Sequence, residues 1–440
     1  MDTSQWRVSS QAIKNSKKPY AHFDFRTDIS ECWDYISNPD NIAHHGFYPF
    51  IHYEQMQIKF SGEKGKKEKA RDICYSAHID RCIYQYYAHL LNEKYNAQVQ
   101  KDGISNVAVA YRTDLHKSNI HFSHEAFSFI RQHTPCYVMI GDFTGFFDNL
   151  EHLYLKSQLC SLLNVSKLPA DYYAVFKNIT RYSTWDLTDL LALNELTDTR
   201  KDRCELNKKM KVLSSKLFND NKSHINKNIN AYGIPQGSAI SALLANVYML
   251  DCDRQLNELV KALNGFYMRY SDDFMIVLPY LDDENALNFY SRIIKIIKSV
   301  PRLYLQPDKT QIFHYSGDSL INCGGNFDKQ ANCKSKFINF LGFTFDGSQV
   351  SIRDKTLSKY YYRMYRKAKT IADNEGYTSS GKHISCQNIY AKYSYKGSAT
   401  PPGNFISYVQ RAQKEYGASE AIQRGTKHHM QKIKKAVRSK

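Results

Sequence analysis

The stretch YSDDFMIVLPYLDD, residues 270–283, contains the pattern Tyr-x-Asp-Asp twice, and its flanks decide how each pair is interpreted. Asp272 and Asp273 lie between the apolar runs GFYMRY and FMIVLP, which predict a β-hairpin with these two carboxylates at its tip. A hairpin tip has no helix for an acidic side chain to cap. Because adjacent carboxylates repel each other unless they are solvated or bound to cations, cation binding is the better account of this pair.

The second pair, Asp282 and Asp283, precedes a run with apolar residues at helical spacing, namely Leu287, Tyr290, Ile294 and Ile297. Acidic residues at the start of a helix cap free N–H groups and interact favourably with the helix dipole. This structural role is sufficient, so the second pair is predicted to be a helix start.

A site for two cations needs a further carboxylate from elsewhere in the fold. The run CYVMIGD, residues 136–142, predicts a buried strand that ends in Asp142. Two Mg²⁺ ions about 3.5–4 Å apart stabilise the attacking and leaving oxygens of a phosphoryl transfer. Mg²⁺ suits such a site because it takes a few carboxylates together with substrate phosphates and water.

The charge of the chain indicates its class of partner. Lys plus Arg number 60 against 43 Asp plus Glu in 440 residues, a net charge of +17. Such a surplus favours a polyanionic partner, most often nucleic acid, over a basic surface that is merely solvated. The 33 tyrosines suit base stacking as well as core packing.

The cysteines and the apolar runs indicate the compartment. The ten cysteines form no C-x-x-C pair, which argues against a zinc ribbon and against a disulfide scaffold. The first 18 residues contain no apolar signal-peptide core, and no apolar run approaches the roughly 20 residues needed to cross a bilayer. We therefore expect a cytoplasmic protein with reduced thiols and no membrane partner.

Several segments have a distinct character. Residues 53–76 predict two strands around a charged turn, and residues 185–230, rich in Asn, Lys and Asp, predict an insertion of mixed helix and loop. A helix is predicted from residue 238, with Ser238 as its N-cap. After residue 350 the chain is basic and mainly helical.

The motifs GDFTGFFD, GIPQGS, YSDD, LQPDKT and FLGF follow one another between residues 55 and 348. In this order they resemble the reverse transcriptases, a family of RNA-directed DNA polymerases. The resemblance implies an α+β right-hand fold with fingers, an antiparallel-sheet palm and a helical thumb. It divides the chain into a helical extension and these three parts, at residues 1–55, 56–135, 136–348 and 349–440.

By similarity to that family, Asp142 and Asp272 are the main ligands of two Mg²⁺ ions, for which Mn²⁺ is a substitute. The Phe143 carbonyl assists them and Asp273 completes the carboxylate cluster. Lys309, in LQPDKT, resembles the lysine near the triphosphate and is a candidate proton donor to the leaving pyrophosphate; the alternative is an ordinary surface lysine.

The resemblance also implies a dNTP site. Phe147 falls where these polymerases place a bulky side chain that excludes a 2′-hydroxyl, unless it is simply a core residue. Gln236, in the Gly-containing turn, is placed to hydrogen-bond a template or nascent pair edge. Lys59 and Arg71, on the two sides of the predicted hairpin, match the fingertip that folds over the triphosphate. Arg71 is the stronger candidate because a guanidinium binds phosphate bidentately.

Template and primer contacts are expected from Arg81, Arg112, Gly237, Tyr361 and Arg363. The last two belong to a segment in which tyrosines alternate with cations, as in a helix that follows a nucleic-acid backbone. Residues 421–440 carry seven Lys or Arg and no acid, which favours nucleic acid over a solvated tail.

Within the family, the chain looks most like the bacterial defence-associated reverse transcriptases, the unknown-group and abortive-infection enzymes. We expect no intron-type endonuclease, since a Cys/His cluster is missing, and no RNase H domain, since no room follows the thumb. The resemblance implies antiphage defence, dNTP substrates, a DNA product and a structured noncoding RNA as template. The oligomeric state stays open.

Other functions remain in view. A template-independent or protein-primed polymerase has the same palm, and a retron-type enzyme is a near neighbour. An RNA-binding scaffold with a vestigial site is disfavoured by the intact carboxylates together with Phe147, Gln236 and Lys309. A two-metal nuclease leaves the fingers hairpin and the Gln-Gly turn unexplained.

Overall fold

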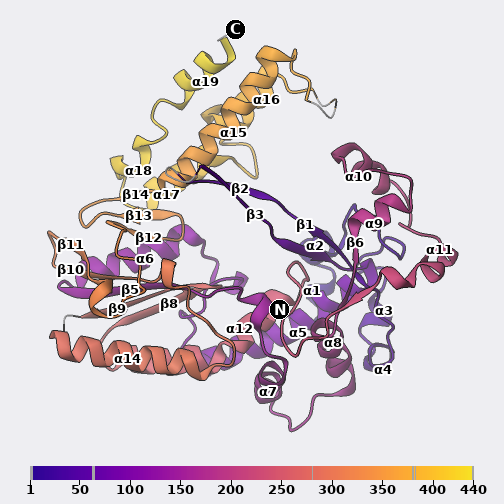
Figure 1. Ribbon diagram of the computed structural model, residues 1–440, viewed down its shortest axis with the longest axis horizontal. Coiled ribbons are helices and arrows are strands. Elements are labelled where there is room, and N and C mark those ends of the chain that lie inside the picture. Colours follow the sequence, from indigo (N-terminus) through magenta and orange to yellow (C-terminus); the bar gives the residue numbers. More distant parts are fainter. Residues whose placement is uncertain (1–2, 62–64, 280, 379–380, 382, 439–440) are drawn as a thin grey trace. The chain divides into compact units, whose positions relative to one another are not determined.

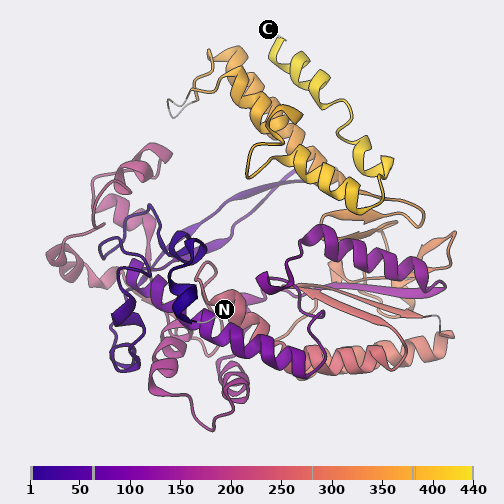
Figure 2. The same cartoon turned by 180° about the vertical axis from the view of Figure 1, so that it is seen from behind.

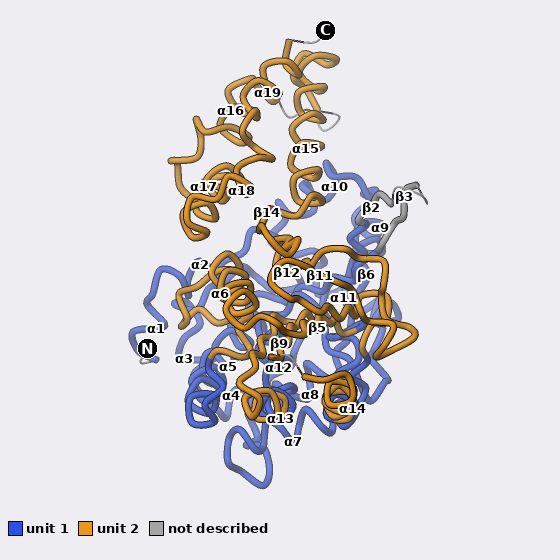
Figure 3. Tube along the Cα trace, turned by 90° about the vertical axis from the view of Figure 1, so that its left-hand side faces the viewer, with its two compact units in different colours: residues 1–105, 144–254, 296–304 blue, residues 106–143, 255–295, 305–440 orange. Residues whose placement is uncertain are grey.

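The computed structural model describes residues 3–61, 65–279, 281–378, 381 and 383–438, and the side chains of residues 57–69 lie outside that description. The chain forms two compact units (Figure 3). Unit 1 comprises residues 1–105, 144–254 and 296–304, and unit 2 comprises residues 106–143, 255–295 and 305–440. The predicted division into extension, fingers, palm and thumb stays a prediction, since each unit draws on several of those segments.

Unit 2 is built around a five-stranded sheet in the order β11-β10-β5-β9-β8. Every neighbouring pair in it is antiparallel. The strands are β5 (Cys136–Asp142), β8 (Phe266–Tyr270), β9 (Asp273–Pro279), β10 (Gln311–Tyr315) and β11 (Leu320–Asn322). The central strand β5 is buried along its whole length, which explains its β-branched and aromatic composition.

Helices cover both faces of this sheet (Figures 1 and 2). Helix α6 (Asn119–Gln132) packs on one face against β8 and β9. Helix α14 (Asp283–Ser299) lies along the other face, where Tyr290 and Ile293 line a small pocket together with Met139 of β5. The core between α6 and the sheet is apolar and includes Phe127, Met275 and Phe313, each almost fully buried.

The C-terminal part of unit 2 is helical. A three-stranded meander, β12 (Ile338–Phe340), β13 (Phe343–Phe345) and β14 (Val350–Ile352), leads into α15 (Asp354–Asp373). Helices α16 (Cys386–Tyr393), α17 (Phe405–Glu415), α18 (Glu420–Arg424) and α19 (His429–Arg438) follow. A separate apolar core, which includes Tyr360, Met364, Ile389 and Ile433, holds α15, α16 and α19 together.

Unit 1 contains a mixed sheet in the order β4-β1-β6-β7. Its strands are β1 (Phe50–Glu54), β4 (Asp72–Tyr75), β6 (Ser183–Asp186) and β7 (Asn226–Lys227), with β1 and β6 parallel. The hairpin β2 (Gln57–Ser61) and β3 (Gly65–Lys69) continues from β1 and β4, so the described residues 53–61 and 65–76 form the two sides of the predicted hairpin, in two stages.

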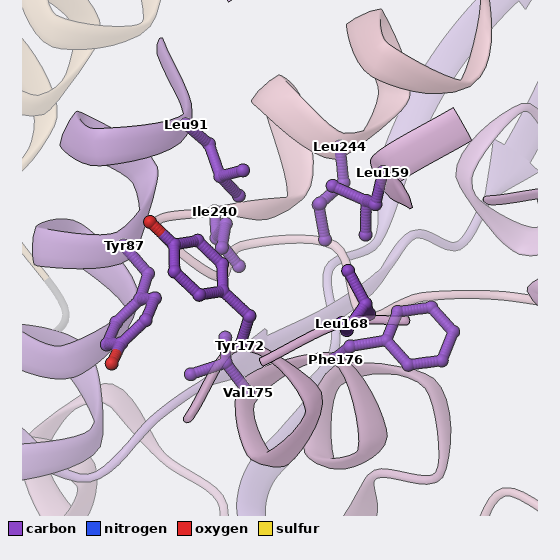
Figure 4. Close-up of a pocket in the computed structure, with 9 residues that line it drawn as sticks. All are labelled: Tyr87, Leu91, Leu159, Leu168, Tyr172, Val175, Phe176, Ile240 and Leu244. Carbon is purple, nitrogen blue, oxygen red and sulfur yellow. The ribbon is translucent and has the colours of Figure 1, made fainter. Parts of the chain in front are cut away.

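Helices surround the sheet of unit 1. The N-terminal segment forms α1 (Thr3–Arg7), α2 (Ser10–Ser16), α3 (Trp33–Ile36) and α4 (Pro39–Ala43). The longest helix of the unit is α5 (His78–Lys101), and α7 (His152–Leu163) and α8 (Ala170–Thr180) follow later in the chain. Helices α5, α7, α8 and α12 (Ser241–Tyr248) meet around an apolar gap of about 10 Å³, lined by residues such as Tyr87, Leu159 and Leu244 (Figure 4). A volume of this size holds one water molecule at most, so this is a packing gap in the core.

The predicted insertion is mixed helix and loop around a short strand pair. It contains β6, β7 and helices α9 (Leu187–Ala192), α10 (Arg200–Leu206) and α11 (Ser215–Asp220). Its apolar side chains Trp185, Leu190 and Val212 are buried together with Phe23 of the N-terminal segment. The insertion is therefore an integral part of the core of unit 1.

The predicted helix start at residue 238 is wrong by three residues. Helix α12 (Ser241–Tyr248) begins after Ile240, and α13 (Leu250–Lys261) follows at once. The Ser241 hydroxyl donates to the Pro235 carbonyl at 2.7 Å, which holds residues 235–240 in a turn. Ser238 is buried and its hydroxyl makes no hydrogen bond within the described residues.

Among the described helices, none is both long enough and apolar enough to cross a membrane.

Candidate active site

The first Asp pair lies at a hairpin tip, as predicted. Strands β8 and β9 pair up to Tyr270 and Asp273, so Ser271 and Asp272 alone form the turn. Ser271 adopts a left-handed backbone conformation with φ +61°, which a two-residue hairpin turn favours. The adjacent carboxylates are therefore held in a fixed, strongly turned segment of backbone.

A buried arginine supports this turn from below. Arg269 is fully buried, and its guanidinium donates to the Ser271 carbonyl at 2.9 Å. The backbone of Arg269 also donates to the residue 107 carbonyl and accepts from the residue 109 N–H, so the edge strand β8 is held by the segment before α6. The hydroxyls of Ser271 and Tyr111 also lie 3.1 Å apart. Sequence reasoning missed this support, although a cation in the apolar run GFYMRY was a signal that could have found it.

Asp142 reaches the same place from the centre of the sheet. It is the last residue of β5 and stands directly opposite Asp273 in the pairing of β5 with β9. The Phe143 N–H donates to the Asp272 carbonyl at 3.1 Å, which ties the chain after β5 to the hairpin turn. Strand register thus places Asp142 opposite Asp273, beside the turn that holds Asp272, although these residues come from segments far apart in the sequence.

Lys309 joins this group. Its ammonium lies 2.6 Å from Asp142 Oδ1, and Asp142 is almost buried. The lysine is placed there because Leu305 bridges to Phe143 and the Gln306 N–H donates to the Asp142 carbonyl at 2.8 Å.

The carboxylate cluster carries uncompensated negative charge. Desolvation, the charges of Asp272 and Asp142, and a hydrogen bond shared with Asp142 together raise the pKa of Asp273 to about 7; Lys309 lowers it by less. Within the part of the chain that is described, no three His, Cys, Asp or Glu side chains are arranged, as they stand, so that they could hold a metal ion. The donor set nevertheless fits a hard divalent cation, since it consists of oxygens on neighbouring strands whose charge one lysine only partly offsets.

The second Asp pair is a helix start, as predicted. Helix α14 begins at Asp283, and Asp282 Oδ1 accepts a hydrogen bond from the Asn285 N–H at 2.9 Å. This bond and one from the Asn285 side chain lower the pKa of Asp282. Asp282 therefore satisfies an N–H group of the first turn, while Asp283 Oδ1 accepts a hydrogen bond from the Tyr137 hydroxyl at 2.9 Å.

In unit 1, the GIPQG turn lies against the segment that follows Thr144. The Ile234 N–H donates to the Phe147 carbonyl at 3.0 Å, and Gln236 Nε2 donates to Asp148 Oδ1 at 3.4 Å. On its other side, the Cys74 N–H of β4 donates to the Gln236 carbonyl at 2.8 Å.

The two glycines of this turn are needed where they stand. Gly233 has φ +88° and Gly237 has φ +108°, conformations that L side chains rarely adopt. A Cβ on Gly237 would lie 2.4 Å from the Cys74 carbonyl oxygen, and one on Gly233 would lie 3.0 Å from that of Asp148. Phe147, Gln236 and Gly237 are thus brought to one place beside β4, and Phe147 is half-buried.

Residues 191–345 match the family model described as reverse transcriptase (RNA-dependent DNA polymerase). This range includes the GIPQG turn, both residues of the first Asp pair and Lys309. This part of the chain, about a third of its length, is therefore similar to a reverse transcriptase domain. Its mixed helix and sheet architecture, with an antiparallel central sheet, confirms the predicted fold class.

Solved structures that match this chain include telomerases from two Candida species. Telomerase from Candida albicans in complex with a fragment of telomeric RNA shares 13% identity at a TM-score of 0.38; the match covers 94% of this chain and 65% of the telomerase chain. Apo telomerase from Candida tropicalis shares 11% identity at a TM-score of 0.40, with 96% and 68% covered. No curated protein sequence matches the chain. This chain thus spans about two thirds of the length of those telomerases.

The structure places the two predicted fingertip residues, Arg71 and Lys59, and the predicted template contact Arg81 as follows. Arg71 is exposed and directly precedes β4, where its backbone pairs with Gln55. Lys59 belongs to β2, and its side chain lies outside the described residues. Arg81 is half-buried on α5 and donates from Nε to the Asn15 carbonyl at 3.0 Å. Arg71 is therefore the one of these three that is shown open to solvent.

The other predicted nucleic-acid contacts differ in exposure. Arg112 is buried, with its guanidinium 2.7 Å from Asp114. Tyr361 is half-buried and donates its hydroxyl to the Gly425 carbonyl at 2.7 Å, whereas Arg363 is exposed. Of the four tyrosines in this segment, Tyr362 and Tyr365 are the exposed ones. Their roles in binding stay predictions, and the exposure favours Arg363 over Arg112 and Tyr361.

A histidine at the base of the fingers hairpin also went unnoticed in the sequence. His52 of β1 lies between two carboxylates, with Nδ1 2.6 Å from Asp186 of β6 and Nε2 3.0 Å from Asp72 of β4. Partial burial lowers the pKa of His52, but the two carboxylates outweigh it and raise that pKa above its ordinary value. The imidazolium thus links three neighbouring strands next to Arg71.

Proposed function

We propose that the protein is an RNA-directed DNA polymerase that transfers nucleotides from dNTPs to a primer end on an RNA template. The observation that carries the proposal is the pairing of Asp142 with Asp273 beside the two-residue turn that holds Asp272. This places three carboxylates at one end of an antiparallel sheet, together with a lysine at 2.6 Å. Structural ion pairs alone do not explain such a cluster, because desolvation together with the charges of Asp272 and Asp142 raises the pKa of Asp273 to about 7.

The carboxylates would hold two divalent cations, Mg²⁺ or its substitute Mn²⁺. Asp142 and Asp272 are proposed as the main ligands, the Phe143 carbonyl as an additional one, and Asp273 as the residue that completes the cluster. Bound there, the cations would stabilise the attacking 3′-oxygen and the leaving pyrophosphate. Lys309 would then release Asp142 and donate a proton to the pyrophosphate, since its ammonium already lies at the site.

The nucleotide is proposed to be held by residues of unit 1. Phe147 would stand against the sugar and exclude a 2′-hydroxyl, and Gln236 would contact the edge of the nascent pair. Arg71 and Lys59 would bind the triphosphate, with Arg71 the stronger candidate because it is exposed and bidentate. Along the chain, Phe147 is only five residues from Asp142, so the two groups of residues are connected by a short segment.

We further propose a role in bacterial antiphage defence, in the cytoplasm, with a structured noncoding RNA as template. The insertion before GIPQG and the basic helical C-terminal region, which resemble those of the defence-associated enzymes, support the defence role, and the net charge of +17 supports a nucleic-acid partner. A polyanionic template agrees with that charge.

The test uses protein purified from its native locus with its co-purifying RNA retained. Labelled dNTPs and Mg²⁺ are added with and without prior RNase, and the products are sequenced. Asp272→Ala is compared with Asp282→Ala, a matched loss of a carboxylate from the Tyr-x-Asp-Asp pattern that serves only as a helix cap. DNA complementary to one RNA, abolished by RNase and by Asp272→Ala but retained in Asp282→Ala, is the expected result.

Two outcomes would contradict the proposal. Low-complexity DNA that survives RNase would identify an untemplated polymerase on the same fold. Absence of DNA from the unaltered protein with every divalent cation and template tried would leave an RNA-binding scaffold, and the carboxylates would need another explanation.

A further inference from the structure

Helix α15 has basic side chains on both sides of its buried stripe. On one side, Lys359 and Arg363 line a groove of about 340 Å³ with Lys392 of α16; we call it the α15–α16 groove. On the other side, Tyr365 and Lys369 line a groove of about 610 Å³ with α19, the α15–α19 groove. Figures 1 and 2 show α16 and α19 beside α15.

Helix geometry separates the two grooves. With 3.6 residues per turn, Lys359 and Arg363 lie about 100–140° to one side of the buried Met364, and Tyr365 and Lys369 lie about 100–140° to the other side. Met364 is fully buried in the core that joins α15 to its neighbours. A nucleic-acid strand lying in one groove therefore leaves the other groove open.

The α15–α19 groove is a basic surface with one aromatic ring. Lys432 and Lys435 of α19 line it together with Lys369, against a single acid, Asp373. Lys369 lies 3.8 Å from Asp373 and its side chain is 79% exposed, so this ion pair is weak.

Two of its side chains are positioned for ligand contact. The Lys432 ammonium lies 4.0 Å from the centroid of the Tyr361 ring, which fixes its direction. The Tyr365 side chain is 45% exposed. Exposed aromatic rings beside lysines favour an unpaired strand, because a ring stacks on a free base while the ammonium groups neutralise phosphates. A duplex offers phosphates but no free base.

We propose that the α15–α19 groove binds an unpaired polynucleotide segment while the copied duplex occupies the α15–α16 groove. The inference rests on the proposed function for the duplex, and adds a second strand-binding surface on the opposite flank of the same helix. The ligand is a single strand of RNA or DNA, recognised by its phosphates and by one stacked base. Such a surface would retain a non-copied part of the template RNA during synthesis.

The experiment measures simultaneous binding to the full-length protein. A fluorescein-labelled, unstructured RNA of about 12 nucleotides, and its DNA counterpart, are titrated with protein that is saturated with an unlabelled primer–template duplex. We expect a duplex-resistant complex for the RNA. Replacing Lys432 and Lys435 by Ala should reduce the log–log salt slope of that complex by about 1.4, since a single strand contributes about 0.7 per phosphate.

Tyrosine variants locate the stacked base. Tyr365→Ala should weaken the duplex-resistant complex by roughly 5- to 150-fold, and Tyr365→Phe should restore it, because stacking needs the ring and not the hydroxyl. The matched control, Lys359→Ala with Arg363→Ala on the other flank, should reduce the salt slope for the duplex instead. Circular dichroism of each variant checks that the helices are retained.

The outcomes separate this inference from the proposed function. If the duplex displaces all of the labelled strand while the protein still extends primers, the second surface does not exist and the polymerase assignment stands. The second surface is equally refuted if the Lys432 and Lys435 replacements leave the salt slope unchanged. Duplex-resistant binding without primer extension would support the groove and overturn the polymerase assignment. A groove that takes the DNA strand alone would contradict retention of template RNA.

Discussion

Replacing Asp273 by Asn should make the metal-free protein more stable above pH 7. The folded environment raises the pKa of Asp273 to about 7, whereas an unfolded Asp titrates near 3.9. The folded state therefore takes up a proton between these values, and its stability falls as pH rises through that window. Above pH 7 the native protein carries the full cost of an ionised Asp273, which Asn removes.

The size of the stability gain follows from the pKa shift of Asp273. Three pKa units correspond to about 4 kcal/mol, at 1.36 kcal/mol for each unit. Because the Asp273 residue is solvent-exposed, screening reduces this figure, and we expect a gain of about 1–2 kcal/mol. For a folding unit of this size that corresponds to roughly 2–8 °C in Tm.

The assay is thermal unfolding in EDTA at pH 8.0 and at pH 4.5, for the native protein and Asp273→Asn. The gain should be full at pH 8.0 and small at pH 4.5, where the native carboxyl is already protonated in the folded state. Addition of Mg²⁺ at pH 8.0 should stabilise the native protein and remove the difference, since the cations offset the same charge. Asp282→Ala, which loses a helix cap, should destabilise at pH 8.0 and serves as the control. An Asp273→Asn protein that is no more stable than the native one at pH 8.0 in EDTA would refute the reasoning.

Three further predictions concern unit 1. His52→Ala should lower the unfolding free energy, measured in urea titrations, by about 1–2 kcal/mol at pH 6 and by less at pH 9. Because the folded environment raises the pKa of His52, the stabilisation by this side chain is complete below pH 6.5 and is lost as pH rises past the folded pKa. Gly237→Ala should lower the unfolding free energy by about 1–3 kcal/mol in the same assay, because φ is +108° at this position and the new Cβ would lie 2.4 Å from a carbonyl oxygen. An unchanged unfolding free energy would mean that the turn can shift. Phe147→Ala should increase the use of NTPs relative to dNTPs by on the order of tenfold in single-nucleotide extension, and unchanged selectivity would mark Phe147 as a packing residue.

Local sequence was enough to interpret the two Asp pairs. Apolar runs with β-branched and aromatic residues on both sides of Ser271 required strands, and the helical spacing after Asp283 required a helix. Both elements are present because these patterns act over a few neighbouring residues. Within α14, however, the predicted apolar side was partly wrong. Leu287 is 45% exposed, while Phe289 and Ile293 are buried.

The exact start of one helix and the exposure of two similar tyrosines depended on contacts that the sequence pattern does not show. The helix predicted from Ser238 begins at Ser241, because the hydroxyl of Ser241 holds the preceding turn through the Pro235 carbonyl. Tyr361 and Tyr365 look alike in a segment of tyrosines and cations, yet only Tyr365 remains open, because α18 and α19 pack beside the other. For the start of α12 and for the exposure of these two tyrosines, the outcome is set by which groups lie close in space.

The sequence by itself determined the chemistry that the protein can offer, namely an acidic hairpin tip, a strand ending in a carboxylate, a Gly-bounded turn and a basic helical region. Only the tertiary structure decided that Asp142 stands opposite Asp273, with Lys309 beside it. It also decided that a buried Arg269 supports the turn and that His52 joins three strands. The physical reason is that strand register and burial arise from pairings between distant segments, whose free energy depends on the packing of the whole core, whereas turns and helix caps depend on a few adjacent residues.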